Sequence, residues 1–448
     1  MQRARKKILI ICGLLTLFGA VSCKKWVGDT PQPTQVDQSV LFSTEQGFRD
    51  VLSGVYLQMG AQSLYGRDLN MGVLSVLGRS YDVNINANIG PLFYQSALYN
   101  LQDPSIKSYS ADVWNKMYQA IANLNNLLVN VEAKKSMFTG NNYNQFKAEA
   151  LALRAYLHFD LLRLFAPSPA AGSTAVPAIP YVTTVNAATT PTGTIDQVVN
   201  QCIADLKAAD GLLAGTTPVA SQLNTWAVKG LLARVYLYYG DTNNAKSYAN
   251  AVIASNAVKL AKANTDLFFT SESLFELYIY QNNYYSFYKS VLTTAANLGL
   301  SATNQTALYV TGNGSAADWR KSFVAPYTGA ATVMPKKFSA TAANTFPMIR
   351  LTEMYYISAE CAVSNADLNS AVALIDTVRV HRNLPVYNAA TLTLASMATE
   401  IQNEYQKEFE GEGQMFFYYK RKNIPFASLP FTVAPVSPNA TYTFIKPE

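Results

Sequence analysis

Apolar residues recur at helical spacing along most of the chain. The segments 44–59, 112–131 and 148–165 each place apolar side chains three or four positions apart, which brings them to one face of an α-helix. Thr44 precedes the first segment as an expected N-cap. The third segment, AEALALRAYLHFDLLRLF, is apolar on nearly every side and is followed by Pro167. It therefore predicts a buried helix that ends there.

A repeat connects two helical segments in the second half of the chain. Its first copy contains Ala233, Tyr236, Gly240, Asp241 and Ala245, and its second copy, offset by 126 positions, contains Ala359, Ala362, Ala366, Asp367 and Ala371. Small residues on successive helices allow the backbones of an antiparallel pair to approach closely. The pattern is similar to the tetratricopeptide helix-turn-helix unit, without its tandem 34-residue period. We therefore expect an all-α (mainly α) fold of dispersed tetratricopeptide-like hairpins with long loop insertions and a few short strands.

Two long insertions are where we expect ligand contacts, because scaffold helices position residues and loops make contacts. They run from Tyr65 to Tyr109 and from Thr270 to Thr345. The second contains LYIYQNNYYSFYKS, which is rich in groups that stack on sugar rings and hydrogen-bond sugar hydroxyls. The candidate ligand-binding residues are Tyr284, Tyr285, Tyr288, Asn282 and Asn283.

An ordinary core is the alternative interpretation of this aromatic segment. Leu277 to Tyr280 can form a strand that places Tyr278 and Tyr280 together on a core-facing side. For the tyrosines beyond the turn-like Asn282 and Asn283, core packing and ligand contact both stay open.

The N-terminus has the pattern of a secretory signal. Four cationic residues precede an apolar run from Ile8 to Val21, which is too short to span a bilayer. Small residues then lead to Cys23, an arrangement that resembles the lipobox of bacterial lipoproteins, in which this cysteine receives the lipid. We expect a signal peptide at 1–22 and a single domain at 23–448, attached to a membrane through lipid on Cys23. A soluble secretory signal is the alternative.

Composition argues against several kinds of chemistry. The formal charge of +6, minus the four cationic residues of the signal, leaves +2 for the mature chain, so a nucleic-acid partner is not expected. Cys202 and Cys361 are the only cysteines beyond the signal and the lipidation position, which implies no disulfide framework. His158 and His381 lie in helical patterns that favour packing or capping. We therefore expect no catalytic site, no metal site and no cofactor.

A charge network is predicted near the C-terminus, in NEYQKEFEGEGQ. Glutamates one helical turn apart repel one another, so they require cationic partners. The predicted members are Glu404, Glu408, Glu410 and Glu412 with Arg350, Arg379 and Arg382. A glycosidase that uses two carboxylates is an alternative for Glu404 and Glu408, although this spacing is common on helix surfaces.

Five blocks of the sequence recur in a known family. They are VWNKMYQAIANLNNLL, AEALALRAYLHFDLLRLFAPSP, SLFELYIY, FPMIRLTEMYYISAECAV and IQNEYQKEFEGEGQMFFYYKR. Together with the lipobox and the opening CKKW, they resemble the SusD/RagB family of Bacteroidetes outer-membrane lipoproteins. The resemblance implies an α-helical fold with four tetratricopeptide-like hairpins.

The resemblance also implies a function. Members of this family sit on the cell surface, cap a SusC-like TonB-dependent β-barrel transporter, and capture glycans, or in some cases peptides, for import. The expectation is a non-catalytic glycan-binding lipoprotein of the outer membrane that faces the cell exterior. A peptide-binding lipoprotein, an interaction scaffold and, less favoured, a surface glycosidase are the alternatives.

Overall fold

Helices dominate the computed structural model of this chain, as the hydrophobic pattern predicts. The structure describes residues 38–82, 90–186, 188–263, 265–266, 268–279, 300–310, 317–326, 332–335, 345–430 and 436–447. Residues up to Gly47 and residues from Phe48 onward form two compact units. Helices α3 (Gln38–Leu41) and α4 (Glu45–Met59) begin the described chain. Gly47 N donates to Thr44 Oγ1 (3.2 Å), which confirms the predicted cap.

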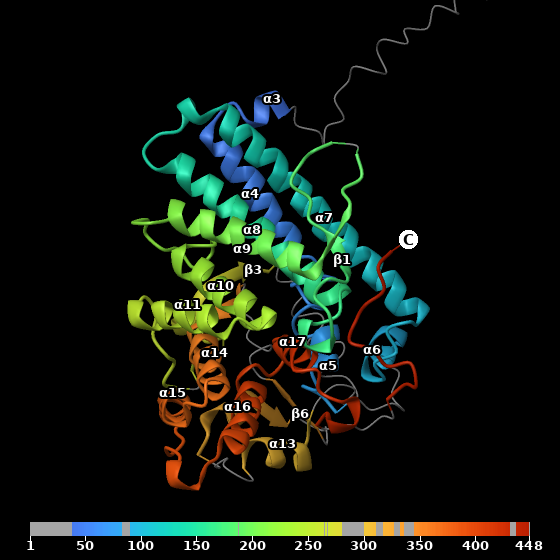
Figure 1. Cartoon of the computed structure of the whole chain (residues 1–448), viewed down its shortest axis with the longest axis vertical. Helices are drawn as coiled ribbons and strands as arrows, with labels where there is room; N and C mark the ends of the chain where they lie inside the picture. The colour runs from blue at the N-terminus through green and yellow to red at the C-terminus, as the bar shows by residue number, and fades with distance from the viewer. Residues whose placement is uncertain are drawn as a thin grey trace, which may run out of the picture. The chain divides into compact units, whose positions relative to one another are not determined.

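Seven long helices of the second unit pack against one another in chain order (Figure 1). They are α7 (Pro104–Ala133), α8 (Asn142–Phe165), α9 (Ile195–Leu212), α10 (Thr225–Tyr239), α11 (Thr242–Ser255), α14 (Leu351–Ser364) and α15 (Leu368–His381). Helix α16 (Leu394–Glu408) then lies against both α14 and α15. Among the described residues, we find no helix whose length and apolar character would let it cross a membrane.

Helix α8 is the buried helix that its sequence predicts. Every side chain from Ala148 to Phe165 is buried. Its charged side chains all find partners: Glu149 pairs with Arg49 (2.8 Å), Arg154 with Asp205 (2.7 Å), and Asp160 with Arg163. Because a buried charge is tolerated only when it is paired, these pairs fix how α8 contacts α4 and α9.

His158 of α8 has a packing role, as expected. Its Nδ1 donates to Arg154 O (2.9 Å), and its Nε2 accepts a hydrogen bond from Val182 N (2.9 Å). Burial lowers the pKa of His158 to about 3. The neutral ring therefore connects α8 to the segment that follows β1 (Pro177–Pro180), which pairs with β2 (Thr192–Thr194) before α9.

The sequence repeat corresponds to two helical hairpins, α10–α11 and α14–α15. Four alanines at matching positions of the repeat, Ala233, Ala245, Ala359 and Ala371, are fully buried. Gly240 and Ala366 occupy the same place in the two turns and share the left-handed backbone conformation, with φ of 98° and 59°. The next residue in each copy, Asp241 or Asp367, caps the second helix of its hairpin.

The first predicted insertion is largely core. Residues Leu64 to Asp82 are nearly all buried. This stretch contains α5 (Val73–Leu77), which packs against α17 (Gln414–Arg421). Ser75 Oγ accepts from Gly413 N (3.1 Å), which connects the two segments. The expectation of a ligand-contacting loop is therefore wrong for this part, and the insertion continues through α6 (Pro91–Ala97) into α7.

The second insertion is closed at its base by a strand pair. Strand β3 (Ser273–Tyr278) pairs antiparallel with β7 (Thr345–Arg350). This pairing brings the chain back so that α14 packs against α11. Inside lie α13 (Ala302–Tyr309) and a sheet of order β4-β6-β5, formed by β4 (Leu300–Ser301), β6 (Thr332–Pro335) and β5 (Val324–Pro326). The predicted strand is confirmed, but Leu277 faces the core whereas Tyr278 is 45% exposed. Tyr280 lies outside the described residues.

A buried charge network joins this insertion to the C-terminal helices. Glu408 bonds to Arg350 (2.8 Å), Arg382 (2.8 Å) and Arg320 (2.9 Å). The other pairs are Glu404 with Arg379 and Arg320, Glu412 with Arg350, Glu272 with Arg350 and Arg382, Asp318 with Arg320, and Lys407 with Glu404. The predicted pairing with Arg350, Arg379 and Arg382 is confirmed for Glu404, Glu408 and Glu412. Arg320, Asp318, Glu272 and Lys407 are members that the sequence pattern did not predict.

The network keeps the carboxylates of Glu408 and Glu404 ionised. Burial alone would raise the pKa of Glu408, but Arg382 and Arg350 hold it well below its ordinary value. Burial is likewise outweighed at Glu404, whose pKa is lowered by Arg320, Lys407 and Arg379. Both side chains are fully buried. A glycosidase needs one carboxyl group that stays protonated, so these two glutamates do not fit that alternative.

The two hairpin turns yield a stability prediction. Ala366→Gly removes the Cβ that the left-handed conformation disfavours, so we expect the free energy of unfolding to rise by about 0.5–1 kcal/mol in urea denaturation. Ala373→Gly, the same change at an exposed position inside α15, should lower it by about 1 kcal/mol. Two losses of similar size would contradict a favourable effect of glycine at this turn.

The charge network yields a second prediction. Glu408→Gln deprives three buried guanidinium groups of a shared carboxylate, so we expect a loss of about 3–5 kcal/mol in the free energy of unfolding at pH 7. Because the folded pKa of Glu408 lies below the ordinary value of 4.5, its stabilisation is complete above that pH and is lost as the pH falls toward the folded value. The difference between wild type and variant should therefore narrow in acid.

Glu132→Gln is the matched control for that experiment. Its carboxylate pairs with Lys147 and its side chain is 52% exposed, so the loss should stay below about 1 kcal/mol. Urea titrations at pH 7, 5, 4 and 3 measure both variants. Equal losses of unfolding free energy in the two variants would count against the network. So would a loss in Glu408→Gln, relative to wild type, that does not change with pH.

Candidate functional site

The residues predicted from sequence as lipid or ligand sites lie outside the described part of the structure. They are Cys23, Asn282, Asn283, Tyr284, Tyr285 and Tyr288. Their roles therefore stay predictions, and the candidate site below is built from other residues.

An open cleft lies at the outer side of the charge network. It has a volume of about 530 Å³ and is lined by Lys262, Ala263, Trp319, Val380, His381 and Asn383. This volume falls within the range of ordinary small-molecule sites. The lining residues come from three segments far apart in the sequence: the chain after α11, the start of the 3₁₀ turn Trp319–Phe323, and the end of α15.

The charge network holds these three segments in place. Ala261 N donates to Glu272 Oε1 (2.8 Å), and Ala261 O accepts from Arg382 Nη1 (2.7 Å). Trp319 lies between Asp318 and Arg320, which pair with each other at 2.8 Å. Each lining segment thus contains or adjoins a buried network residue, so the cleft is rigid where the network is intact.

Trp319 is the aromatic surface of the cleft. Its Nε1 donates to His381 O (2.7 Å), which fixes the ring between two lining segments. The guanidinium carbon of Arg382, a fully buried residue, lies 5.0 Å from the ring centroid. The ring itself is half-buried. A ring held on its inner side and partly open on its outer side can stack against the apolar face of a sugar.

Polar groups surround this ring. Asn383 has a left-handed backbone (φ 61°), which turns the chain at the end of α15, and its Nδ2 donates to Ala317 O (3.0 Å). Its Oδ1 can accept from a ligand hydroxyl. Lys262 and Asn383 are exposed, and His381 is half-buried. The cleft can therefore combine stacking with hydrogen bonding.

No carboxylate is among the described residues that line the cleft. Glycoside hydrolysis in most families requires two, so this lining supports binding rather than that reaction. Among the described residues, moreover, no group of three or more histidine, cysteine, aspartate or glutamate side chains is placed to hold a metal ion.

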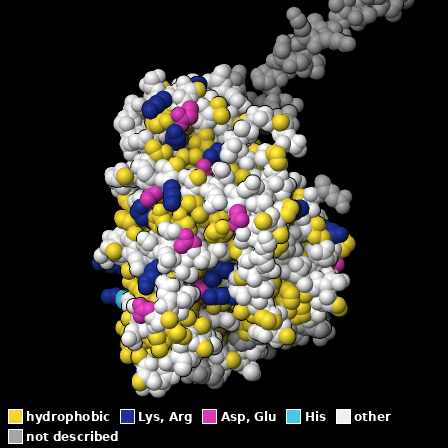
Figure 2. All heavy atoms as spheres, viewed as in Figure 1, with side chains coloured by type: hydrophobic (Ala, Val, Ile, Leu, Met, Phe, Trp, Pro, Cys, Tyr) yellow, Lys and Arg dark blue, Asp and Glu magenta, His cyan; other side chains and the backbone are white. Residues whose placement is uncertain are grey.

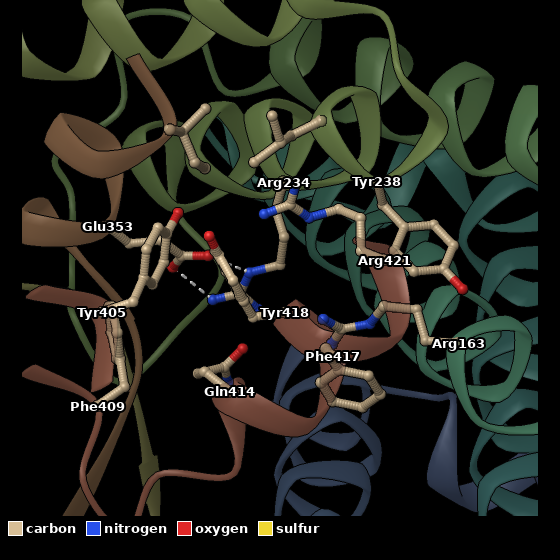
Figure 3. Close-up of a pocket in the computed structure, with 12 residues that line it drawn as sticks. Arg163, Arg234, Tyr238, Glu353, Tyr405, Phe409, Gln414, Phe417, Tyr418 and Arg421 are labelled. Atoms are coloured by element: carbon tan, nitrogen blue, oxygen red, sulfur yellow. Dashed lines mark hydrogen bonds and ion pairs between the residues drawn. The ribbon is translucent and has the colours of Figure 1, made fainter. Parts of the chain in front are cut away.

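A second cavity is too small for a sugar. Arg163, Arg234 and Arg421 extend toward a common space beside Gln414 and Tyr418 (Figure 3). Its volume is about 40 Å³, enough for roughly three water molecules. The three guanidinium groups pair with Asp160, Glu353 and Glu360. The first pair lies within α8, the second joins α10 to α14, and the third joins α17 to α14. This cavity is part of the scaffold.

Trp319 is the binding candidate that sequence reasoning missed. It lies inside the second predicted insertion, in ADWRKSF, but far from the tyrosine cluster that drew attention there. A lone tryptophan beside charged residues is a weak signal, because nothing local indicates which neighbours it meets. Nothing in the sequence pattern around Lys262 or Asn383 indicates a binding residue.

Charged side chains are dispersed over the surface. On the face drawn in Figure 2, lysines and arginines lie beside aspartates and glutamates, with apolar atoms between them. This face presents no broad basic surface of the kind that binds nucleic acid.

Solved structures share the fold. A SusD superfamily protein from Bacteroides thetaiotaomicron VPI-5482 matches with a TM-score of 0.69 at 22% identity, over 85% of this chain and 89% of that one. A SusD-like carbohydrate binding protein from Bacteroides vulgatus ATCC 8482 gives 0.70 at 19%, over 85% and 83%. A SusD superfamily protein from Bacteroides fragilis gives 0.68 at 22%, over 85% and 91%. These likenesses show the fold.

Family models identify the sequence itself. A model described as "Starch-binding associating with outer membrane" matches residues 37–237, and a model described as "SusD family" matches residues 224–429. A search among curated proteins gives no match. The two models join in one continuous span, and both describe the same kind of protein as the five sequence blocks. The chain belongs to the SusD/RagB family.

Proposed function

We propose that this protein is a cell-surface, glycan-binding lipoprotein that captures an oligosaccharide and delivers it to a SusC-like TonB-dependent transporter in the outer membrane. Its family is associated with the outer membrane and with carbohydrate binding. One observation carries the proposal for this chain: an open cleft combines the partly exposed ring of Trp319 with hydrogen-bonding groups. Members of the family are generally non-catalytic, and the described part of the cleft lining, which contains no carboxylate, supports the same role here.

Delivery and anchoring are further parts of the proposal. The family in general works with SusC-like transporters, and one such barrel is the proposed partner here. Cys23 is the proposed lipid attachment point, with 1–22 removed as a signal and the chain facing the exterior. Tyr284, Tyr285, Tyr288, Asn282 and Asn283 are proposed as additional ligand contacts.

Ligand capture can be measured by calorimetry on a soluble form that starts after Cys23. We expect it to bind one or more members of an oligosaccharide panel, and Trp319→Ala to weaken that binding about tenfold, since a stacked aromatic contributes roughly 0.5–1.5 kcal/mol beyond its buried area. Trp319→Phe should retain most of the affinity, because it keeps a ring in place.

Trp226→Ala is the matched control, because Trp226 is a half-buried tryptophan of α10 that lines a separate hollow. Loss of binding in this variant instead would move the site there, and loss only in a Tyr284→Ala, Tyr285→Ala double variant would move it to the aromatic insertion. Binding of a matched peptide panel alone would replace the glycan assignment, and binding of neither panel would favour an interaction scaffold.

Anchoring can be measured by labelling cells with a clickable palmitate analogue. We expect wild type to be labelled and to fractionate with the outer membrane, and Cys23→Ala to lose both properties. Several acyl chains on one residue are enough to hold a protein on a membrane. Cys12→Ala, in the same N-terminal segment, should leave labelling unchanged. A labelled Cys23→Ala protein would contradict this attachment point.

A further inference from the structure

Lys262 and His381 are the titratable side chains among the described residues that line the cleft, and both are basic. Lys262 makes no hydrogen bond or ion pair with any residue that the structure describes, and its side chain is exposed. His381 Nδ1 is engaged by Thr377 O (2.8 Å) on its own helix. Its Nε2 is therefore the ring nitrogen that faces a ligand, and it donates a hydrogen bond to an anion when the ring is protonated.

Carboxylates on the neighbouring segments are occupied by protein donors. Asp266 accepts four hydrogen bonds, from the backbone N and the side-chain hydroxyl of Thr270 and of Ser271, at 2.8–2.9 Å. Asp318 is buried against Arg320, and Asp376 accepts from Tyr387 N (2.9 Å). These three carboxylates are bound to other groups, and none of them forms an ion pair with Lys262.

Trp319 places an aromatic ring beside these basic side chains. Buried Arg382 lies 5.0 Å from its centroid, and Arg382 in turn bonds to Glu272 and Glu408. The guanidinium thus covers part of the ring by a cation–π contact, and Phe269 packs against the same ring with the two centroids 5.9 Å apart. The part of the ring that lines the cleft is uncharged, so an acidic sugar that stacks on it meets no repulsion from the ring.

We propose that this cleft selects an acidic saccharide, in which one ring stacks on Trp319 while a carboxylate or sulfate ester is bound by Lys262 and His381. Asn383 then meets the hydroxyls of the stacked sugar. The proposal rests on the proposed function, because it names the class of glycan captured at the same cleft. An ammonium group and a protonated imidazole ring donate to either anion, so the experiment separates the two sources.

Calorimetry with matched probes provides the test. The carboxylate probe is an oligogalacturonate compared with its methyl ester, which has the same skeleton without charge. The sulfate probe is a sulfated chondroitin oligosaccharide compared with its desulfated counterpart. We expect at least one acidic member to bind the soluble form tenfold or more tightly than its neutral counterpart. That preference should shrink as salt is raised, because exposed charges are screened.

Variants locate the preference. Lys262→Gln should reduce the affinity for the acidic member about fivefold to tenfold while leaving the neutral member unchanged, and His381→Gln should act in the same direction. Lys259→Gln is the matched control, since Lys259 is an exposed lysine on the same segment that does not line the cleft. The control should leave both affinities unchanged.

The outcomes separate this proposal from the proposed function. Neutral saccharides that bind through Trp319, with no advantage for acidic ones, would overturn the acidic selectivity and leave glycan capture in place. An acidic preference unaffected by Lys262→Gln and His381→Gln would also overturn it, because the anion would then be bound elsewhere. If no saccharide of either kind binds, both proposals fail.

Discussion

The structure depends on one constraint: the charges of the C-terminal region are buried and must therefore be paired with one another. Glu408 alone meets three guanidinium groups. Removing charges from water costs several kcal/mol per ion, and only good geometry with further hydrogen bonds offsets this. Because each arginine donates in fixed directions, the network accepts few arrangements of the segments that carry it. The insertion between α11 and α14 is held to the last helices by this requirement.

The cleft is a consequence of the same constraint. Its lining side chains project from backbone segments that the network already positions, and Trp319 and Asn383 are held further by their hydrogen bonds to His381 O and Ala317 O. This division of roles explains why the network residues are buried while the lining residues remain partly or fully exposed. A binding site of this kind can change its ligand by changing exposed residues while the buried pairs stay the same.

The sequence predicts those features that depend on local periodicity. Helix α8, the two hairpins and the need of Glu404 and Glu408 for cationic partners all follow from spacing along the chain. Arg320 and Glu272 could not be predicted as partners, because they come from an insertion whose path is set by strand pairing and tertiary contacts. The burial of the first insertion was missed for a related reason: a short apolar stretch fits a core segment and a partly exposed loop equally well.

The two parts of the fold contribute differently to function. In the hairpins, buried alanines bring the helices close together, which produces a closely packed scaffold. The insertion closed by β3 and β7 adds depth, because it returns to the helices at an angle set by the charge network and leaves a hollow beside Trp319. In the proposed function, the scaffold therefore fixes where the ligand binds, whereas a few exposed side chains of the cleft select it.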